Sequence, residues 1–315
     1  MTVAMYMGSW PQNIGNAFFD LGAEAQMRLS LPEERIIRTG GAVHWMFNNS
    51  DTSKFHLLPR KLQTLLPRRF ERNGNSLELG QLISARLIVF AGMSVCKEFA
   101  DNNGPTFEMF KKNGGKILGL GVGASNYSSD DVNPFIRMCE QIGGISLITR
   151  DENTFKLLEG KIEILHRGID SAFFLPEYFP KPSLINNNFY VSNFDSMPEP
   201  NFVTQKNPLR THHDLWGPLP KRYINAANTV VSDIPEDYLS IYSNADTTYS
   251  DRVHACVATL AYGNSAQFFG KTQRAKLFTE VGIEDIGTLS RLDLEELSLI
   301  KRSQLELIKK LAKDN

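Results

Sequence analysis

The segment Gly115-Lys-Ile-Leu-Gly-Leu-Gly-Val-Gly-Ala-Ser125 has the continuous apolar character of a strand buried on both faces, and it ends in a glycine-rich turn. The earlier segment Ala85-Arg-Leu-Ile-Val-Phe-Ala-Gly92 repeats the pattern. Between them, Phe107-Glu-Met-Phe-Lys-Lys-Asn113 has the character of a helical crossover. This order predicts repeated β-α-β units, and therefore an α/β fold built on a parallel sheet.

The same organisation extends to both sides of this region. Residues 3–7 predict a first strand, which is followed by a polar turn and a helix from Ala17. Ile145-Ser-Leu-Ile-Thr149 predicts another strand, with a helix directly after it. The turn at Gly121 lacks the third glycine and the later acidic partner of a dinucleotide site, so it predicts a loop near a pocket rather than an NAD site.

The length of 315 residues, with 42% apolar content, favours two domains. A cluster of prolines marks the predicted boundary, namely Pro176, Pro180 and Pro182. We predict an N-terminal Rossmann-like domain over residues 1–180 and a C-terminal Rossmann-like domain with a basic rim over 181–290. Residues 291–315 predict a long helix that packs across a domain face, with an apolar stripe that begins at Leu294.

The composition excludes several classes of partner and cofactor. Lysine plus arginine (34) nearly balance aspartate plus glutamate (35), so no overall field favours nucleic acid. Cys96, Cys139 and Cys256 are far apart and lack metal-ligand spacing, which predicts reduced, buried thiols. The chain shows neither a basic, apolar leader nor a run near the roughly 18 apolar residues of a membrane span, so the expected location is cytoplasmic.

The stretch Tyr249-Ser-Asp-Arg-Val-His-Ala-Cys256 places Arg252 and His254 where a loop enters a helix. A fixed cation, a titratable imidazole and the unpaired N–H groups of a helix start together favour an anion site. The alternative is that Arg252 pairs with Asp251 or with a helix carboxylate and that His254 is a hydrogen-bonded core histidine.

Two further edges carry cations. The apolar strand that ends at Phe269 leads into the basic loop Gly270-Lys-Thr-Gln-Arg-Ala-Lys276, and Arg150 follows the strand that ends at Thr149. Because ligands of open α/β folds bind at the carboxyl ends of strands, these cations favour a shared rim. For Arg150, an exposed ion pair with Asp151 or Glu152 is the alternative.

Two polar motifs have weaker implications. Asn13 and Asn16 are good capping residues for the first helix, and Gly15 permits backbone φ values that other residues resist. A capped helix start is therefore the simple interpretation of this turn. The pair His212 and His213 suggests a metal, but adjacent side chains do not readily share one site and no third ligand has suitable spacing. We expect no metal.

Several short motifs together resemble one family. They are Asn13-Ile-Gly-Asn16, Ile148-Thr-Arg-Asp151, Asp170-Ser-Ala-Phe-Phe174, Asp251-Arg-Val-His-Ala255 and a basic segment after Gly263. Their order and separation resemble the polysaccharide pyruvyl transferase family, over most of the chain. The resemblance implies two Rossmann-like domains facing a cleft, similar to the GT-B glycosyltransferase architecture.

The resemblance also implies a reaction. A pyruvyl group would pass as a ketal from phosphoenolpyruvate, as co-substrate, to a sugar diol of a polysaccharide or of its lipid- or nucleotide-linked precursor. No cofactor is implied. The implied partners are the donor and a sugar or glycolipid acceptor, with peripheral association with membrane-bound glycan assembly enzymes as a further expectation. A nucleotide-sugar glycosyltransferase of the same shape and a catalytically silent sugar-binding relative are the alternatives.

The resemblance assigns roles to the residues already singled out. His254 would perform general acid/base work or activate the phosphate, and Arg150 and Arg252 would hold the donor anions and complete the catalytic set. Several members of the family place a lysine where Arg274 stands, with Lys271 nearby. An arginine there can hold phosphate but does not readily donate a proton. The remaining expectation concerns the acceptor side of the cleft, which would be formed by Asn13, Gly15 and Asn16.

Overall fold

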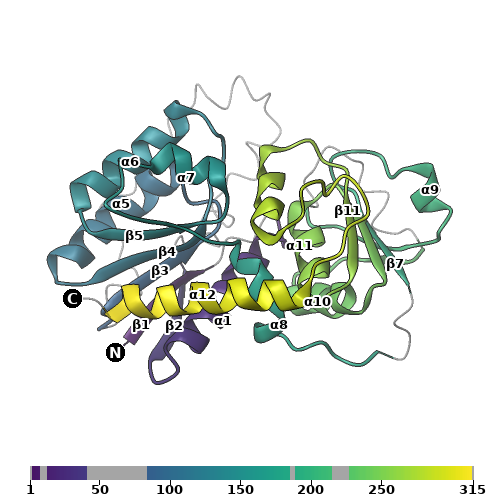
Figure 1. Cartoon of the computed structure of the whole chain (residues 1–315), viewed down its shortest axis with the longest axis horizontal. Coiled ribbons are helices and arrows are strands. Elements are labelled where there is room, and N and C mark those ends of the chain that lie inside the picture. Colours follow the sequence, from purple (N-terminus) through teal and green to yellow (C-terminus); the bar gives the residue numbers. More distant parts are fainter. Residues whose placement is uncertain (1, 8–12, 41–83, 185–188, 215–226, 314–315) are drawn as a thin grey trace, which may run out of the picture.

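The computed structural model describes residues 2–7, 13–40, 84–184, 189–214 and 227–313. Within these ranges the chain forms two parallel sheets, each in its own lobe (Figure 1). The strands of the first sheet all precede residue 168, and those of the second all follow residue 189. The chain therefore passes from one sheet to the other through the proline-containing segment after Leu175.

The first sheet has six strands among the described residues, in the order β2-β1-β3-β4-β5-β6, and every adjacent pair is parallel. The strands are β1 (Thr2–Met7), β2 (Arg35–Gly40), β3 (Leu87–Ala91), β4 (Lys116–Val122), β5 (Ile145–Thr149) and β6 (Ile164–Arg167). Strands β1, β3 and β4 are buried almost throughout, as expected for a parallel sheet with helices on both faces.

One face of this sheet is covered by α5 (Lys97–Lys112) and α6 (Ser129–Ile142), whose Phe107 and Phe135 are fully buried. Helix α5 is longer than the predicted segment 107–113 because it continues through Pro105. The opposite face carries α1 (Asn16–Ser30), in which nearly every side chain from Ala17 to Met27 is buried. Helix α7 (Glu152–Leu158) follows β5 and is capped by Asp151.

The second sheet has five described strands in the order β11-β10-β7-β8-β9, again all parallel. Its strands are β7 (Tyr190–Asn193), β8 (Leu209–Thr211), β9 (Thr229–Val230), β10 (Thr247–Ser250) and β11 (Ser265–Phe268). One face packs against α11 (Val253–Ala261), which lies beside α10 (Pro235–Asn244). On the other face, α9 (Asn201–Thr204) buries Val203 in an aromatic cluster with Phe194 and Tyr249.

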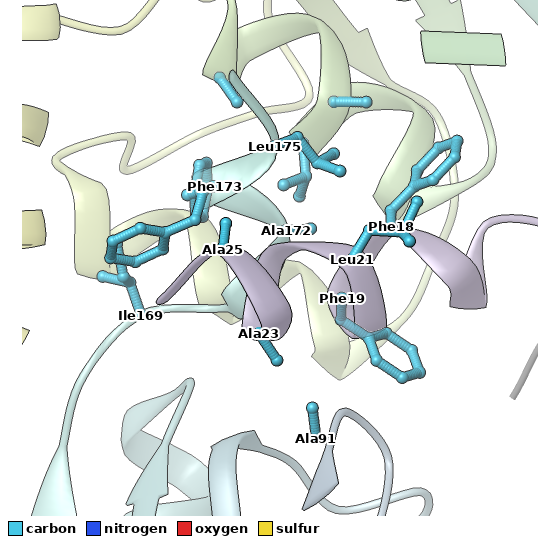
Figure 2. Close-up of a cluster of buried hydrophobic side chains, with 14 of the residues drawn as sticks. Phe18, Phe19, Leu21, Ala23, Ala25, Ala91, Ile169, Ala172, Phe173 and Leu175 are labelled. Carbon is cyan, nitrogen blue, oxygen red and sulfur yellow. The ribbon is translucent and has the colours of Figure 1, made fainter. Parts of the chain in front are cut away.

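A short segment joins the two lobes through one core. The 3-10 turn η2 (Ser171–Phe174) and helix α8 (Leu175–Tyr178) pack between α1 and α11. In the view of Figure 2, Phe173 lies near Ala25 of α1, and Leu175 lies between Phe173 and Phe18 of the same cluster. A Cβ at Gly22 would collide with the carbonyl oxygen of Ser171, so α1 can approach this turn closely only with glycine there.

The final helix, α12 (Leu294–Lys313), runs from the second lobe back along the first (Figure 1). Its Gln304 donates to Gln26 of α1 at 2.7 Å, and Lys116 of β4 donates to the carbonyl oxygen of Ala312 at 3.1 Å. The predicted apolar stripe is wrong at its start, because Leu294 is 48% exposed and the buried face begins at Leu297. In the chain, α12 is preceded by the 3-10 helix η4 (Gln273–Val281) of the second lobe.

The three cysteines carry free thiols, and their settings differ. Cys139 and Cys256 are buried, and burial raises the pKa of Cys139 to about 12. Cys96 is only half-buried, so the expectation of three buried thiols is wrong for this residue.

Candidate active site

A cavity of about 480 Å³ lies where the carboxyl-terminal edges of the two sheets face each other. It is lined by residues that follow β3, β5, β7, β8, β10 and β11, together with the start of α1. Such edges are where open α/β sheets bind ligands. Seven of the residues singled out from the sequence are among those that line it, namely Asn13, Asn16, Arg150, Arg252, His254, Lys271 and Arg274.

Arg150 projects from the end of β5 and is only 1% exposed, so the alternative of an exposed ion pair is wrong. Its Nη1 donates to Oδ2 of Asp170 at 2.9 Å, and its Nε lies 3.9 Å from Oδ2 of Asp151. Within the described part of the chain, Nε and Nη2 have no hydrogen-bond partner. A Cβ at Gly123 would collide with this guanidinium, which explains the small residue in the turn after β4.

Asp170 lies between Arg150 and His254. It is fully buried, caps η2 by accepting from the N–H of Ala172 at 2.9 Å, and lies 3.5 Å from Nε2 of His254 through the same oxygen that Arg150 contacts. Burial alone would raise the pKa of Asp170, but the adjacent His254 and Arg150 hold it well below its usual range. Asp170 is therefore an ionised carboxylate shared by a cation and an imidazole.

Arg252 stands immediately before α11 and is held by two carboxylates. Its Nε donates to Asp195 Oδ2 at 2.9 Å and its Nη2 donates to Asp214 Oδ2 at 3.2 Å. Asp251 lies farther away, at 3.8 Å, so Asp195 and Asp214 are its main partners rather than the predicted neighbour. Burial would raise the pKa of Asp195, but His212 and Arg252 lower it. The guanidinium is thus oriented at the cavity wall before any ligand arrives.

Asp251 ties together the loops after β7 and β10. Its carboxylate accepts from the backbone N–H groups of Asp195, Ser196 and Met197 at 3.1, 2.7 and 2.9 Å. Burial raises the pKa of Asp251 in spite of these bonds. The Asp251 carboxylate therefore holds the loop that carries Asp195 in place, and Asp195 in turn holds Arg252.

The basic loop after β11 completes the cationic wall. Lys271 is exposed at the rim, while Arg274 is half-buried and reaches the first lobe, where its Nη2 lies 3.4 Å from the carbonyl oxygen of Ser125. Burial, followed by the charges of Arg150 and Arg252, lowers the pKa of Arg274. Arg274 is therefore close enough to Arg150 and Arg252 for their positive charges to act on it.

The turn before α1 was interpreted partly wrongly. Asn13 and Asn16 line the cavity, but Gly15 does not, and its φ of −60° is one that any residue adopts. Glycine is required there for space, because a Cβ would lie 2.5 Å from Nδ1 of His213. Asn13 accepts from the Gly15 N–H at 3.0 Å, but the N-cap position of α1 is Gly15, so the expectation that Asn13 or Asn16 occupies it is wrong.

His213 also lines the cavity, although the sequence drew attention to it only as a metal ligand beside His212. Its Nε2 lies 2.7 Å from the hydroxyl of Tyr242, and burial lowers its pKa to about 3, so it is a neutral imidazole. His212 instead contacts Asp195, at 3.0 Å. The described residues contain no group of three or more potential metal ligands.

Asp170 and Asp195 were also missed as site residues. Asp195 follows a strand end just as Arg150 does, so the same positional signal applied to both. Asp170 stood within a quoted motif, but only the folded chain brings it to His254. His213 gave no comparable signal because β8 has three residues, too few for a pattern.

The fold and this cavity define a two-lobed α/β protein of GT-B type whose cavity is lined by three arginines and two histidines. A sequence model described as polysaccharide pyruvyl transferase matches residues 42–263, which include Arg150, Asp170, Arg252 and His254. The chain therefore belongs to the polysaccharide pyruvyl transferase family, a family of transferases, as its motifs predicted. Asn13, Asn16, Lys271 and Arg274 lie outside the matched residues.

Solved structures confirm the fold class. UDP-GlcNAc 2-epimerase from Methanocaldococcus jannaschii superposes with a TM-score of 0.52 at 11% identity, over 100% of this chain and 94% of that one. S. aureus MnaA, solved with UDP, gives a TM-score of 0.52 at 10% identity, over 99% and 88% of the two chains. At such identities the likeness concerns architecture alone. No curated protein matches the sequence.

Across the described residues, none of the helices combines the length and the apolar character needed to cross a bilayer.

Proposed function

We propose that this protein transfers the pyruvyl group of phosphoenolpyruvate to two hydroxyl groups of one sugar, as a ketal. The observation that carries the proposal is the convergence of Arg150, Arg252 and Arg274 with His254 on one cavity of about 480 Å³. Guanidinium groups bind phosphate and carboxylate oxygens bidentately, and an anion at this cavity would also relieve the unfavourable effect of Arg150 and Arg252 on the Arg274 charge. Phosphoenolpyruvate, with a phosphate and a carboxylate, is such an anion.

The two lobes would hold different parts of the donor. Helix α11 has nine residues, and its start lies at the cavity between Arg252 and His254. The first N–H groups of a helix have no intrahelical acceptor, which suits them to phosphate oxygens. Arg150, with two nitrogens that lack hydrogen-bond partners in the described structure, would take the carboxylate from the first lobe.

The reaction needs one proton carrier and no change of oxidation state. Protonation of the enol methylene gives a methyl group and a cationic carbon, which the first sugar hydroxyl attacks. The second hydroxyl then replaces phosphate at that carbon, so one hydroxyl proton ends in the methyl group and the other leaves with phosphate. An imidazole is suited to such transfers near neutral pH, and we assign this work to His254.

The acceptor would enter from the side of Asn13 and Asn16, whose amides can both donate to and accept from sugar hydroxyls. We propose as acceptor a polysaccharide or its lipid- or nucleotide-linked precursor, used without a cofactor. A lipid-linked acceptor would bring the protein to membrane-bound glycan assembly enzymes. The donor is a cytoplasmic metabolite, so we propose that compartment for the reaction.

The test is incubation of the purified chain with phosphoenolpyruvate and galactose-, glucose- or mannosamine-containing acceptors. Phosphate release and a new ketal methyl resonance in the sugar product are expected, and both should be lost in His254→Ala. Calorimetric binding of a nucleotide sugar, with no response to phosphoenolpyruvate, would contradict the proposal in favour of glycosyl transfer. No turnover with any acceptor, together with unaltered behaviour of His254→Ala, would indicate a silent sugar-binding protein.

A further inference from the structure

We propose that Asp170 is the positioning residue that fixes the proton-bearing nitrogen of His254 and so presents the other nitrogen to the substrate. The inference rests on the proposed function for its consequence in catalysis, but not for its geometry. Oδ2 of Asp170 lies 2.9 Å from Nη1 of Arg150 and 3.5 Å from Nε2 of His254. Asp170 belongs to the first lobe and His254 to the second, so the contact crosses between them.

The Asp170 carboxylate cannot readily turn away from His254. Its other oxygen caps η2 through the N–H of Ala172 at 2.9 Å, and the next residue, Ser171, donates to the carbonyl oxygen of Leu120 at 3.3 Å. The η2 turn also packs directly on α1, because Gly22 has no Cβ and lets the α1 backbone approach the backbone of Ser171. Contacts with Arg150 and Ala172, together with the Ser171 bond to Leu120, therefore fix the orientation of the buried Asp170 carboxylate.

The charge state of Asp170 decides the tautomer of His254. The carboxylate is ionised and fully buried beside Arg150, so it offers only acceptor positions. A nitrogen that faces an acceptor at this distance must carry its own hydrogen to interact favourably. Nε2 of His254 is buried and makes no hydrogen bond in the described structure, but it faces the Asp170 carboxylate at 3.5 Å, and from this contact we infer that the hydrogen lies on Nε2.

This assignment leaves Nδ1 as the working nitrogen. The His254 side chain is 12% exposed and lines the cavity, although its Nε2 is sealed from solvent. The ring packs on Phe19 at 5.4 Å between centroids, which limits its rotation. Asp170 and the neutral His213 interact electrostatically with His254, and the charged Arg150 and Arg252 line the same cavity. In this setting Nδ1 gives up or accepts the proton, while Nε2 keeps its hydrogen and directs it at the Asp170 carboxylate.

The arrangement also makes catalysis depend on the relation of the lobes. His254 alone, on α11, would be free to adopt either tautomer in solution. Only when the second lobe is seated on η2 does the ring meet a fixed carboxylate. Asp170 would thus couple the proton carrier of one lobe to the Arg150 anion clamp of the other.

The experiment compares wild type with Asp170→Asn, using Asp285→Asn as the matched control, because Asp285 accepts from the N–H two residues ahead, that of Gly287 at 2.9 Å, just as Asp170 does, but does not line the cavity. The asparagine oxygen can still accept from Arg150 or Ala172, but its amide hydrogens no longer favour Nε2–H. With ¹⁵N-labelled histidine, long-range ¹H–¹⁵N spectra should show the Nε2–H tautomer of His254 in wild type and in Asp285→Asn, and its loss in Asp170→Asn. The resonances are assigned from their absence in His254→Ala.

In turnover assays, kcat of Asp170→Asn should fall about 100-fold, the scale of a misplaced acid/base group. KM for phosphoenolpyruvate should change less than about threefold, because the anion clamp itself is retained. Asp285→Asn should keep wild-type kinetics.

Three results would overturn the inference. One is an Nδ1–H tautomer in wild type, a measurement that holds even if the variant does not fold. Another is an unchanged tautomer in Asp170→Asn. The third is a loss of activity that comes wholly from donor affinity, matching Arg150→Lys. If the tautomer switches but wild type releases no phosphate from phosphoenolpyruvate, the positioning role stands and the proposed substrate is wrong.

Discussion

The carboxylate of Asp195 lies 2.9 Å from Nε of Arg252, and the same oxygen accepts from the backbone N–H groups of His213 and Asp214, at 3.0 and 3.2 Å. One buried carboxylate therefore positions both a cavity cation and the loop after β8. The Asp195 backbone N–H is in turn held by Asp251. Arg252 is therefore not an isolated cation at the rim, because it is the cavity-lining member of a network of hydrogen bonds with Asp195 and Asp251.

We expect Arg252→Lys to lower donor affinity about tenfold, because an ammonium keeps the charge but cannot form the fork to Asp195 and Asp214. Stability should fall by only about 1 kcal/mol, since one hydrogen bond of the network is lost. Calorimetric titration with phosphoenolpyruvate and urea unfolding measure the two effects. Arg210→Lys is the matched control, because Arg210 makes a similar fork to Glu199 without lining the cavity. Equal losses of affinity in both variants would contradict the expectation.

Arg274→Ala should weaken donor binding about tenfold, while Lys276→Ala should leave it unchanged. Both residues lie in η4, but Arg274 lines the cavity and Lys276 is exposed and does not. The loss should shrink as salt is added, because the contribution is electrostatic. Titrations at low and high ionic strength test both points. An equal effect of Lys276→Ala would show that the loop contributes only diffuse charge.

Gly15→Ala should destabilise the protein and lower turnover together, since the added Cβ would lie 2.5 Å from Nδ1 of His213 and push the loop after β8 away from α1. Gly104→Ala is the control. It lies within α5, where a Cβ would meet only the flexible Met138 at 3.3 Å and the higher helix propensity of alanine offsets the contact. Thermal melting and steady-state assays separate the two. A Gly15→Ala variant as stable and active as Gly104→Ala would refute the steric account.

Stability should fall as the pH drops from about 6.5 toward 3, because His213 is neutral in the folded protein, with a pKa lowered to about 3 by burial, and protonates near 6.5 when unfolded. The unfolded state then binds more protons, so His213 contributes up to about 1.4 kcal/mol of lost stability for each pH unit in this window. Above 6.5 its contribution is fully present. Urea unfolding across this range should give a flatter profile for His213→Gln, and identical slopes would contradict the assignment.

The sequence predicted the architecture well where the chemistry is local. Strands β3, β4 and β5 are continuous apolar runs, so their parallel pairing followed from composition and order. Helix α5 was underestimated because Asn102, Asn103, Gly104 and Pro105 resemble a turn. In the folded chain Asn103 bonds back to Phe99 and is buried, so tertiary packing overrides these residues' weak helix propensity.

The site was predictable at strand ends and less so elsewhere. Arg150, Arg252 and Lys271 each follow a strand, and the parallel topology brings such positions to one edge. The partners of these cations were not predictable, because Asp170, Asp195 and Asp214 are separated from them by at least 20 residues. Hydrogen bonds between positions so distant in sequence exist only once the lobe that carries them has folded.

One continuous hydrophobic core runs from α1 through η2 and α8 to α11. The two lobes therefore share a core, although each has its own sheet. Helix α12 then fastens the end of the chain onto β4 of the first lobe. Calorimetric melting should accordingly show a single endotherm, and neither half of the gene expressed alone should yield a soluble product. A chimera that took one lobe from a relative would therefore also need matching residues on the other side of this shared core.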